Sequence, residues 1–377
     1  MTDLPHPAEA MPARRGLKGW SARLIASRGF QRWAAGFPLT RGLVRREGEA
    51  LFELLAGFCH SQVLMALVQL DIPQILLDRP RDAPDLARQC GVPVPRMEIL
   101  LRATVALGLI KRTRHQTFKL SRKGAALVGV PGLGAMIKHH DILYRDLTDP
   151  AAFFRGETKT ELAAFWPYVF GGDMDAEVAA TYSDLMAQSQ QLVAEDTLRV
   201  LDFSKVSTVL DVGGGSGAFL EHVGRAYPKL NLMLFDLPKV APSAGPRFAR
   251  AGMAERAKIA IGSFQSDPLP TGADAISLIR VLYDHSDATV MALLEKCYAT
   301  LPAGGGLFIS EPMTGGATPE RAGDVYFALY TLAMQTGKAR SAAEISLLCQ
   351  AAGFVPAATP KAPRPFVTRC LEMRKPG

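Results

Sequence analysis

The residues that stand out for their chemistry are a glycine-rich turn and the acids around it. A short apolar strand expected at 208–212 runs directly into the sequence GGGSG at 213–217, and a helix is expected to follow from Ala218. Glycines let the backbone approach a ligand closely, and a helix N-terminus presents free N–H groups to a polar group. Asp236 stands directly after the next expected strand, where an acid can accept both hydroxyl groups of a ribose. This pattern indicates a site for a ribose-containing ligand.

The turn alone leaves three interpretations open. Gly213, Gly215 and Ala218 satisfy a loose G-x-G-x-x-A pattern, which is compatible with a nicotinamide or flavin dinucleotide. Asp211 lies two residues before the first glycine, where dinucleotide folds usually carry an apolar residue, and only one nucleotide-binding half follows. Those two features favour S-adenosylmethionine. The third interpretation is a glycine-rich turn that binds no ligand.

An α/β domain is expected to position this turn. From about residue 205 onward, short apolar strands alternate with helices, a texture typical of a doubly wound domain. The strands that we expect cover residues 208–212, 231–235, 259–261, 275–280 and 306–310. The glycine-rich turn follows the first of these strands and Asp236 follows the second.

The preceding residues, 47–195, are expected to be mostly helical. Two short helices at 83–91 and 94–108, followed by a hairpin of residues 109–110 and 117–120, form a winged-helix pattern. The uncharged run 54–70 contains polar residues and is too short for a membrane span, so we interpret it as a buried helix. We therefore divide the chain into a basic arm (1–46), a helical domain (47–195) and the α/β domain (196–377).

Charge is concentrated in the N-terminal arm. Residues 1–46 carry nine Lys and Arg against two acidic residues, so the arm accounts for the whole net charge of +7 and the remaining chain is neutral. Large apolar side chains are interleaved with these cations, namely Trp20, Leu24, Ile25, Phe30, Trp33 and Phe37. The arm is expected to rest on an anionic membrane surface, or else to pack on a partner subunit or stay disordered.

Several other classes of function receive little support. The five cysteines are scattered without a C-x-x-C pair, which predicts a reducing compartment and no zinc site, and the N-terminus lacks a secretory signal. Residues 71–125 are basic, as in a winged-helix DNA-binding regulator. However, the helix at 94–108 that would enter the groove is mostly apolar, so we expect no nucleic-acid partner.

The segments after the glycine turn resemble one enzyme family. The sequences GSF at 262–264, IRVLYDHSD at 279–287 and LPAGGGLFISEP at 301–312 are similar to class I methyltransferases of the caffeate/acetylserotonin O-methyltransferase family, from about residue 50 to the end. The resemblance implies a Rossmann-like C-terminal domain with a seven-stranded doubly wound sheet, behind an N-terminal helical winged-helix dimerisation domain. It also implies S-adenosylmethionine as cofactor, S-adenosylhomocysteine as product and a homodimer.

The resemblance further implies which residues contact the cofactor. Gly213, Gly215 and Gly217 would flank its methionine part, Asp236 would hold the ribose, and Phe264 would pack on the adenine. The complete expected set is Asp211, Gly213, Gly215, Gly217, Asp236, Ser263, Phe264, Arg280, Tyr182, Met186 and Ser189.

A narrower similarity suggests a substrate. The segments FQR at 30–32, FPLTR at 37–41, HHD at 139–141 and VLYDH at 281–285 resemble the hydroxycarotenoid O-methyltransferases of purple phototrophic bacteria. This implies methylation of the tertiary 1-hydroxyl of an apolar hydroxyneurosporene or demethylspheroidene in carotenoid biosynthesis, in the cytoplasm with peripheral contact at the inner or photosynthetic membrane. A C-methyltransferase of bacteriochlorophyll biosynthesis is an alternative that the sequence does not separate.

The catalytic residues depart from the family pattern. Where plant members have a basic His followed by Asp and Trp, this chain has Tyr283, Asp284 and His285. A neutral tyrosine is a poor base at pH 7, so we assign Tyr283 to hydrogen bonding or positioning. His285 acts as the base if its loop turns inward, although an exposed His285 is equally compatible with the sequence.

The carboxylates and the remaining histidines complete the catalytic candidates. Glu311 matches the first acidic support of the plant site, but the second corresponds to Ala339. We expect proton loss to accompany methyl transfer, with His285 or His140 accepting the proton. Of the adjacent His139 and His140, at most one is expected to line the pocket. In the alternative without a catalytic role, one is solvated and the other is hydrogen-bonded inside the protein. No third metal ligand lies near them, so no metal is expected.

Overall fold

The computed structural model describes residues 18–165 and 189–377, and the described chain divides after residue 66 into two compact units. The first unit contains α1 (Lys18–Ala26), α2 (Arg28–Gly36) and most of α3 (Arg41–Gln69). Ser27 caps α2 by accepting a hydrogen bond from the backbone N–H of Phe30 (3.3 Å). Ser27 alone thus separates two short helices, and the described part of the arm is mainly helical.

The long helix α3 exposes an apolar surface in the single chain. Five large apolar side chains near its middle are between 64% and 72% exposed: Leu51, Phe52, Leu54, Leu55 and Phe58. The expectation of a buried helix over 54–70 is therefore wrong for the N-terminal part of that run, and only the C-terminal end, from Met65, is mainly buried. By length and hydropathy, α3 is also the one helix in the described ranges that is able to cross a membrane.

The second unit begins with a helical part that includes the predicted winged helix. Its elements are α4 (Ile72–Asp78), α5 (Ala83–Cys90), α6 (Val94–Ala106), β1 (Ile110–Arg112), β2 (Phe118–Leu120), α7 (Arg122–Gly129), α8 (Leu133–Asp146), α9 (Pro150–Phe154) and α10 (Glu161–Phe165). Strands β1 and β2 pair antiparallel, with Ile110 opposite Leu120. The predicted order of helix, turn, helix and hairpin is confirmed.

The α/β part follows a further helix over residues 189–198. Its helices are α12 (Ala218–Ala226), α13 (Ala244–Arg250), α14 (Asp287–Thr300), α15 (Ala328–Met334) and α16 (Ala342–Ala351), and its strands are β3 (Thr208–Val212), β4 (Asn231–Asp236), β5 (Ala257–Ile261), β6 (Ala275–Ile279), β7 (Gly306–Glu311), β10 (Val355–Ala358) and β11 (Arg369–Arg374). Shorter elements are the single turns Ala241–Ser243, Ala254–Arg256 and Leu282–Asp284, the π-helix Arg321–Phe327, and the paired strands β8 (Met313–Thr314) and β9 (Arg340–Ser341).

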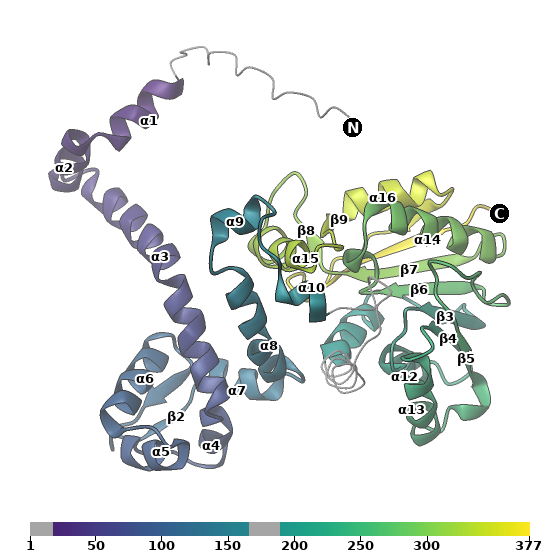
Figure 1. The fold of residues 1–377 in the computed structure, drawn as a ribbon, viewed down its shortest axis with the longest axis horizontal. Coiled ribbons are helices and arrows are strands. Elements are labelled where there is room, and N and C mark those ends of the chain that lie inside the picture. The colour runs from purple at the N-terminus through teal and green to yellow at the C-terminus, as the bar shows by residue number, and fades with distance from the viewer. Residues whose placement is uncertain (1–17, 166–188) are drawn as a thin grey trace. The chain divides into compact units, whose positions relative to one another are not determined.

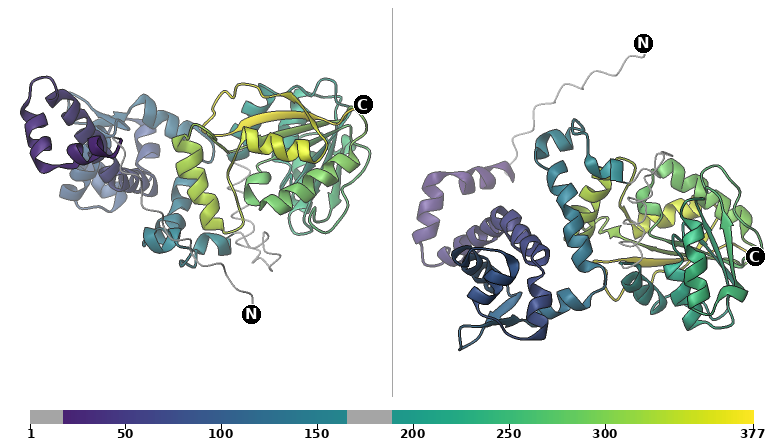
Figure 2. Two further views of the ribbon diagram at one scale, coloured as in Figure 1. Left: turned by 90° about the horizontal axis from the view of Figure 1, so that it is seen from above. Right: turned by 60° about the horizontal axis from the view of Figure 1, so that its bottom comes forward.

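The main sheet has seven strands in the order β10-β11-β7-β6-β3-β4-β5. Strands β3 to β7 are parallel, while β11 runs antiparallel to both β7 and β10. Helices α12 and α13 cover one face and α14 and α16 the other (Figures 1 and 2). Successive residues of β3 point to opposite faces of the sheet: Val209 belongs to the core under α12, and Leu210 belongs to the core under α14.

The topology determines where a ligand can bind. From β3 the chain moves outward through β4 to β5, then returns to β6 on the other side of β3. The strand order therefore reverses between β3 and β6, and in open α/β sheets a crevice opens at such a point beyond the carboxyl ends of the strands. The predicted fold class is confirmed. The boundaries at residues 46 and 195 stay a prediction.

Candidate functional site

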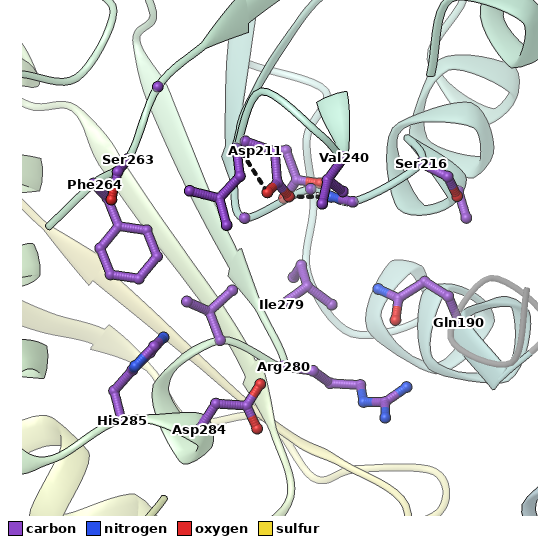
Figure 3. Close-up of a pocket in the computed structure, with 18 of the residues that line it drawn as sticks. Gln190, Asp211, Ser216, Val240, Ser263, Phe264, Ile279, Arg280, Asp284 and His285 are labelled. Atoms are coloured by element: carbon purple, nitrogen blue, oxygen red, sulfur yellow. Dashed lines mark hydrogen bonds between the residues drawn. The ribbon is translucent and has the colours of Figure 1, made fainter. Parts of the chain in front are cut away.

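A pocket lies at the carboxyl ends of the parallel strands, where the strand order reverses (Figure 3). It is lined by these sequence-predicted residues: Asp211, Gly213, Gly215, Asp236, Ser263, Phe264, Arg280 and His285. Gly217 and Ser189 lie outside this lining, although Ser189 accepts a hydrogen bond from the Nη1 atom of Arg280 (2.7 Å). Tyr182 and Met186 lie outside the described residues.

The glycine turn is built from conformations and approaches that a side chain would obstruct. Gly213 has a φ of 71°, and its N–H donates to the carbonyl of Phe235 (2.8 Å). Gly217, at the start of α12, has a φ of 76°, and a Cβ atom there would lie 2.7 Å from Phe248. Left-handed backbone is unfavourable for residues with a Cβ, so the turn requires glycine at both places.

Asp236 is held in place by the glycine turn. One carboxylate oxygen accepts a hydrogen bond from the Gly215 N–H (2.7 Å), and the other accepts one from its neighbour, the Leu237 N–H (2.7 Å). Burial raises the pKa of Asp236, and these two bonds offset part of that effect. The carboxylate is thus fixed at the pocket wall before any ligand arrives.

Asp211 is the second acid of the pocket and is fully buried. Its Oδ1 accepts a hydrogen bond from the Ser277 hydroxyl (2.6 Å), whereas its Oδ2 is buried and has no hydrogen-bond partner among the described residues. Burial, with a smaller contribution from the charge of Asp236, raises the pKa of Asp211 to about 7, although the hydrogen bond from Ser277 opposes this shift. Because an unpaired buried carboxylate oxygen is costly, this site suits a ligand that brings a positively charged donor.

Arg280 leaves β6 in an unusual conformation. Its φ is 59°, and its backbone N–H donates to the carbonyl of Ser310 (2.9 Å). Non-glycine residues in this region store strain and cluster at functional sites. The side chain lines the pocket and links it to Ser189, among the helical residues 189–198.

The turn that follows Arg280 carries the catalytic candidates and rests on Glu311. One oxygen of this buried carboxylate accepts the N–H groups of Val281 and Leu282 (both 2.8 Å), and the other accepts that of Tyr283 (3.4 Å). Burial raises the pKa of Glu311 to about 7, although the three hydrogen bonds oppose that shift. Glu311 is not part of the pocket lining, so its contacts are with the backbone of the turn.

His285 faces into the pocket, which decides between the two placements left open by the sequence. Its side chain lies edge-on to Phe264, with the ring centroids 5.2 Å apart (Figure 3). The residue is 6% exposed, and burial, together with the charge of Arg340, lowers the pKa of His285 to about 4. The imidazole is therefore neutral at pH 7, and its lowered pKa makes it a weaker base than an exposed histidine.

Tyr283 lies on the same turn and is equally buried, but it is not part of the pocket lining. Burial raises the pKa of Tyr283 above its ordinary range, and the charge of Asp284 adds to this rise. The charge of Arg280 and a hydrogen bond with it act in the opposite direction. A phenol with a raised pKa stays protonated at pH 7, so Tyr283 is a hydrogen-bonding group.

The two adjacent histidines of α8 each have a tyrosine partner. His139 Nε2 lies 2.8 Å from the hydroxyl of Tyr330, and His140 Nε2 lies 2.6 Å from that of Tyr326. The alternative in which one of the two is solvated and only the other is hydrogen-bonded does not hold, because each histidine has its own tyrosine partner and the two tyrosines lie four residues apart. Burial lowers the pKa of both imidazoles, that of His139 to about 4. His140 is outside the pocket lining.

Two further residues of the site were not predicted. Gln190 lines the pocket, and Arg340 donates to the carbonyls of Leu282 and His285 on the catalytic turn (both 2.8 Å). Within the described ranges, no group of three or more His, Cys, Asp or Glu side chains is arranged to hold a metal ion.

Comparisons with known proteins identify relatives of both parts of the chain. A family profile described as an O-methyltransferase domain matches residues 144–355, and one described as an O-methyltransferase dimerisation domain matches residues 52–129. The demethylspheroidene O-methyltransferase of Cereibacter sphaeroides is 52% identical over 97% of each chain. That of Rhodobacter capsulatus is 46% identical over 99% of this chain and 93% of its own.

The solved structures that match the chain include CalO1, a methyltransferase in calicheamicin biosynthesis with S-adenosylhomocysteine bound. It superimposes with a TM-score of 0.72 at 26% identity, covering 88% of this chain and 98% of its own.

Proposed function

The chain belongs to the family of S-adenosylmethionine-dependent O-methyltransferases with an N-terminal dimerisation domain, and we propose that it methylates the tertiary hydroxyl of an acyclic hydroxycarotenoid. The observation that carries this proposal is the near-full-length similarity to two demethylspheroidene O-methyltransferases. Such a substrate is a long apolar polyene with a 1-hydroxyl group, and its methylation is a step of carotenoid biosynthesis.

The pocket residues fit S-adenosylmethionine. When bound, this cofactor supplies a methyl group on a sulfonium, which an oxygen nucleophile can attack. Asp211 would accept the ammonium group with its buried, unpartnered oxygen, and Asp236 would hold the ribose hydroxyls. Phe264 would pack on the adenine, while Gly213 and Gly215 let the backbone lie against the methionine part.

The roles that we propose for the residues near the methyl-accepting hydroxyl follow from their position and burial. An aliphatic alcohol is a far weaker acid than a phenol, so proton loss must accompany methyl transfer. His285 lines the pocket beside Phe264, and this position supports it as the proton acceptor. Tyr283 then has a positioning role through hydrogen bonding. The Glu311 carboxylate supports the turn that carries Tyr283 and His285, because it accepts backbone N–H groups of that turn. His140, bonded to Tyr326, is the alternative acceptor.

Purified enzyme with labelled S-adenosylmethionine tests the proposed activity. Demethylspheroidene or hydroxyneurosporene should be labelled on oxygen, and a bacteriochlorophyll precursor should remain unlabelled. Label on a carbon atom of the bacteriochlorophyll precursor, with no transfer to the carotenoid, contradicts the proposal.

The dimerisation-domain match supports a homodimer, and its first residue lies within α3. We propose that the exposed apolar side chains of α3 pack on a second copy of the chain rather than on lipid. The same interpretation leaves α1 and α2 as the membrane-facing part of the arm.

We further propose that α2, together with α1, contacts the cytoplasmic face of the inner or photosynthetic membrane. Trp33 and Phe37 stack with ring centroids 4.9 Å apart and are 54% and 37% exposed, beside the cations Arg28 and Arg32. Exposed aromatic rings among cations suit an anionic interface, where each cation contributes about 1 kcal/mol. A surface of this kind brings the enzyme to a substrate that is insoluble in water.

A charge-reversal pair tests this contact. R28E/R32E should lose most binding to vesicles of phosphatidylglycerol in a sedimentation assay. The control R96E/R102E changes the charge equally on exposed positions of α6 and should bind as the unmodified enzyme does. Equal binding by the two variants rejects the proposal.

A further inference from the structure

Arg340 is one of the most completely buried large side chains of the described chain, at 2% exposed. Its Nη1 donates to the carbonyls of Leu282 (2.8 Å) and Lys338 (3.0 Å), and its Nη2 donates to that of His285 (2.8 Å). Its Nε donates to the Asp287 carboxylate (2.8 Å). A buried guanidinium is tolerated only when its donors are satisfied in this way.

The carbonyl groups that Arg340 binds belong to the turn that carries His285. The carbonyl of Tyr283, between them, accepts the backbone N–H of Lys338 (2.9 Å). The segment 338–340 thus satisfies the carbonyls of residues 282, 283 and 285. On the other side, Glu311 accepts the N–H groups of residues 281–283. The turn is held between a buried cation and a buried anion.

Burying two charged side chains around a turn costs desolvation free energy, so a gain in stability does not by itself explain this arrangement. Apolar residues of similar volume are often at least as stabilising as a buried ion pair. What hydrogen-bonded charges supply is a fixed geometry, since each donor direction selects one position of the backbone. Methyl transfer depends on alignment, and a displacement of about 1 Å can lower a rate about 100-fold.

We infer that Arg340 is a positioning residue for methyl transfer, which fixes the carbonyl side of the turn 282–285 and thereby the place of His285 in the pocket. The inference rests on the proposed function to the extent that His285 faces the acceptor. Asp287, at the start of α14, anchors the guanidinium from outside the turn.

The substitution R340M removes the donors while keeping a long apolar side chain. We expect kcat to fall at least about 30-fold and KM for S-adenosylmethionine to stay within about threefold, because Asp211, Asp236 and the glycine turn are untouched. Guanidinium added to R340A should restore part of kcat, whereas sodium chloride at the same concentration should not. A folded R340M with kcat within threefold of the unmodified enzyme overturns the inference, as does an unchanged kcat with a raised KM.

Lys338 provides the matched control, because it pairs with the same Asp287 carboxylate (2.6 Å) but is 47% exposed and donates no side-chain bond to the turn. K338M should keep kcat within twofold. If R340M does not fold, D287N tests the same anchor from a half-exposed position. It should lower kcat three- to tenfold relative to K338M, and equal kcat values for D287N and K338M overturn the inference.

A crystal structure of R340M with S-adenosylhomocysteine separates this inference from the proposed function. We expect the turn 282–285 to be displaced by about 1 Å or more with His285 moved, while the Asp236 contacts persist. An undisplaced turn overturns the inference whichever substrate the enzyme methylates. Absence of methyl transfer to any hydroxycarotenoid by the unmodified enzyme, with a displaced turn in the variant, overturns only the proposed function.

Discussion

Replacing Gly217 by alanine tests whether the geometry of the glycine turn controls cofactor binding. The residue starts α12 with a φ of 76°, and an added Cβ would lie 2.7 and 2.9 Å from two ring atoms of Phe248 and 3.2 Å from Ala244. Phe248 belongs to α13 and is fully buried in the core that α12 and α13 share with the sheet, so its ring has little room to withdraw. The substitution must therefore move the beginning of α12 or the turn before it.

Gly252 offers a matched control for the size of the effect. Its φ is 68°, but a Cβ there would meet nothing within 4 Å. G252A should thus carry only the left-handed backbone cost of about 1–2 kcal/mol, whereas G217A adds an overpacking cost of about 1–3 kcal/mol. The total for G217A is about 2–5 kcal/mol, and its Tm should fall roughly twice as far as that of G252A.

Calorimetric titration with S-adenosylhomocysteine connects this stability effect to the site. G217A should weaken binding at least about tenfold, because the same displacement reaches Gly215, whose N–H holds Asp236. G252A should bind as the unmodified enzyme does. Equal losses of Tm in the two variants, or unchanged affinity in G217A, would refute the steric reasoning.

Three further predictions address the chemistry of the pocket. D211N should weaken S-adenosylmethionine binding at least about tenfold by calorimetry with little loss of Tm, because the anionic partner of the ammonium is lost; unchanged affinity contradicts that assignment. H285A and H140A should be compared by turnover: H285A should lower kcat at least about tenfold with KM for the cofactor unchanged, and if neither variant loses that much, proton acceptance by histidine is wrong. Folding lowers the pKa of His285 from 6.5 to about 4, so the unfolded chain binds more protons between these pH values and stability falls as the pH drops from about 6.5 to 4. H285N should show a shallower decrease of Tm over that range, and an identical decrease shows that His285 is not the titrating group.

Most of the fold follows from patterns that lie within a few residues of one another. The strands that begin at 208, 231, 275 and 306 combine apolar runs with turn residues, and the structure starts β3, β4, β6 and β7 at those positions. Strand β10 carries no such pattern, because its four residues, including Pro356, are all exposed at the sheet edge. The strand therefore depends on pairing with β11, which the local sequence does not indicate.

The site likewise has a part that the local sequence predicts and a part that depends on contacts between residues far apart in the chain. Asp211, Asp236 and the glycine turn belong to a single strand–helix–strand unit. Because this unit is short, the sequence alone predicts that these residues lie close together. The contacts of His139 and His140 join residues more than 180 positions apart, and those of Arg340 with the catalytic turn span more than 50. The placement of such side chains depends on the packing of whole helices, which residue types and spacing do not specify.

The position of β11 has a consequence for how the enzyme is made. This strand, from the last nine residues of the chain, lies between β7 and β10, and its Arg369 pairs with Glu311 at the end of β7. Residues 369–374 are synthesised well after β7, so β7 keeps an open edge until this later segment has left the ribosome. The sheet beneath the catalytic turn is therefore completed only when β11 pairs with β7, and a chain that stops before residue 369 leaves the edge of β7 open to pairing with another chain.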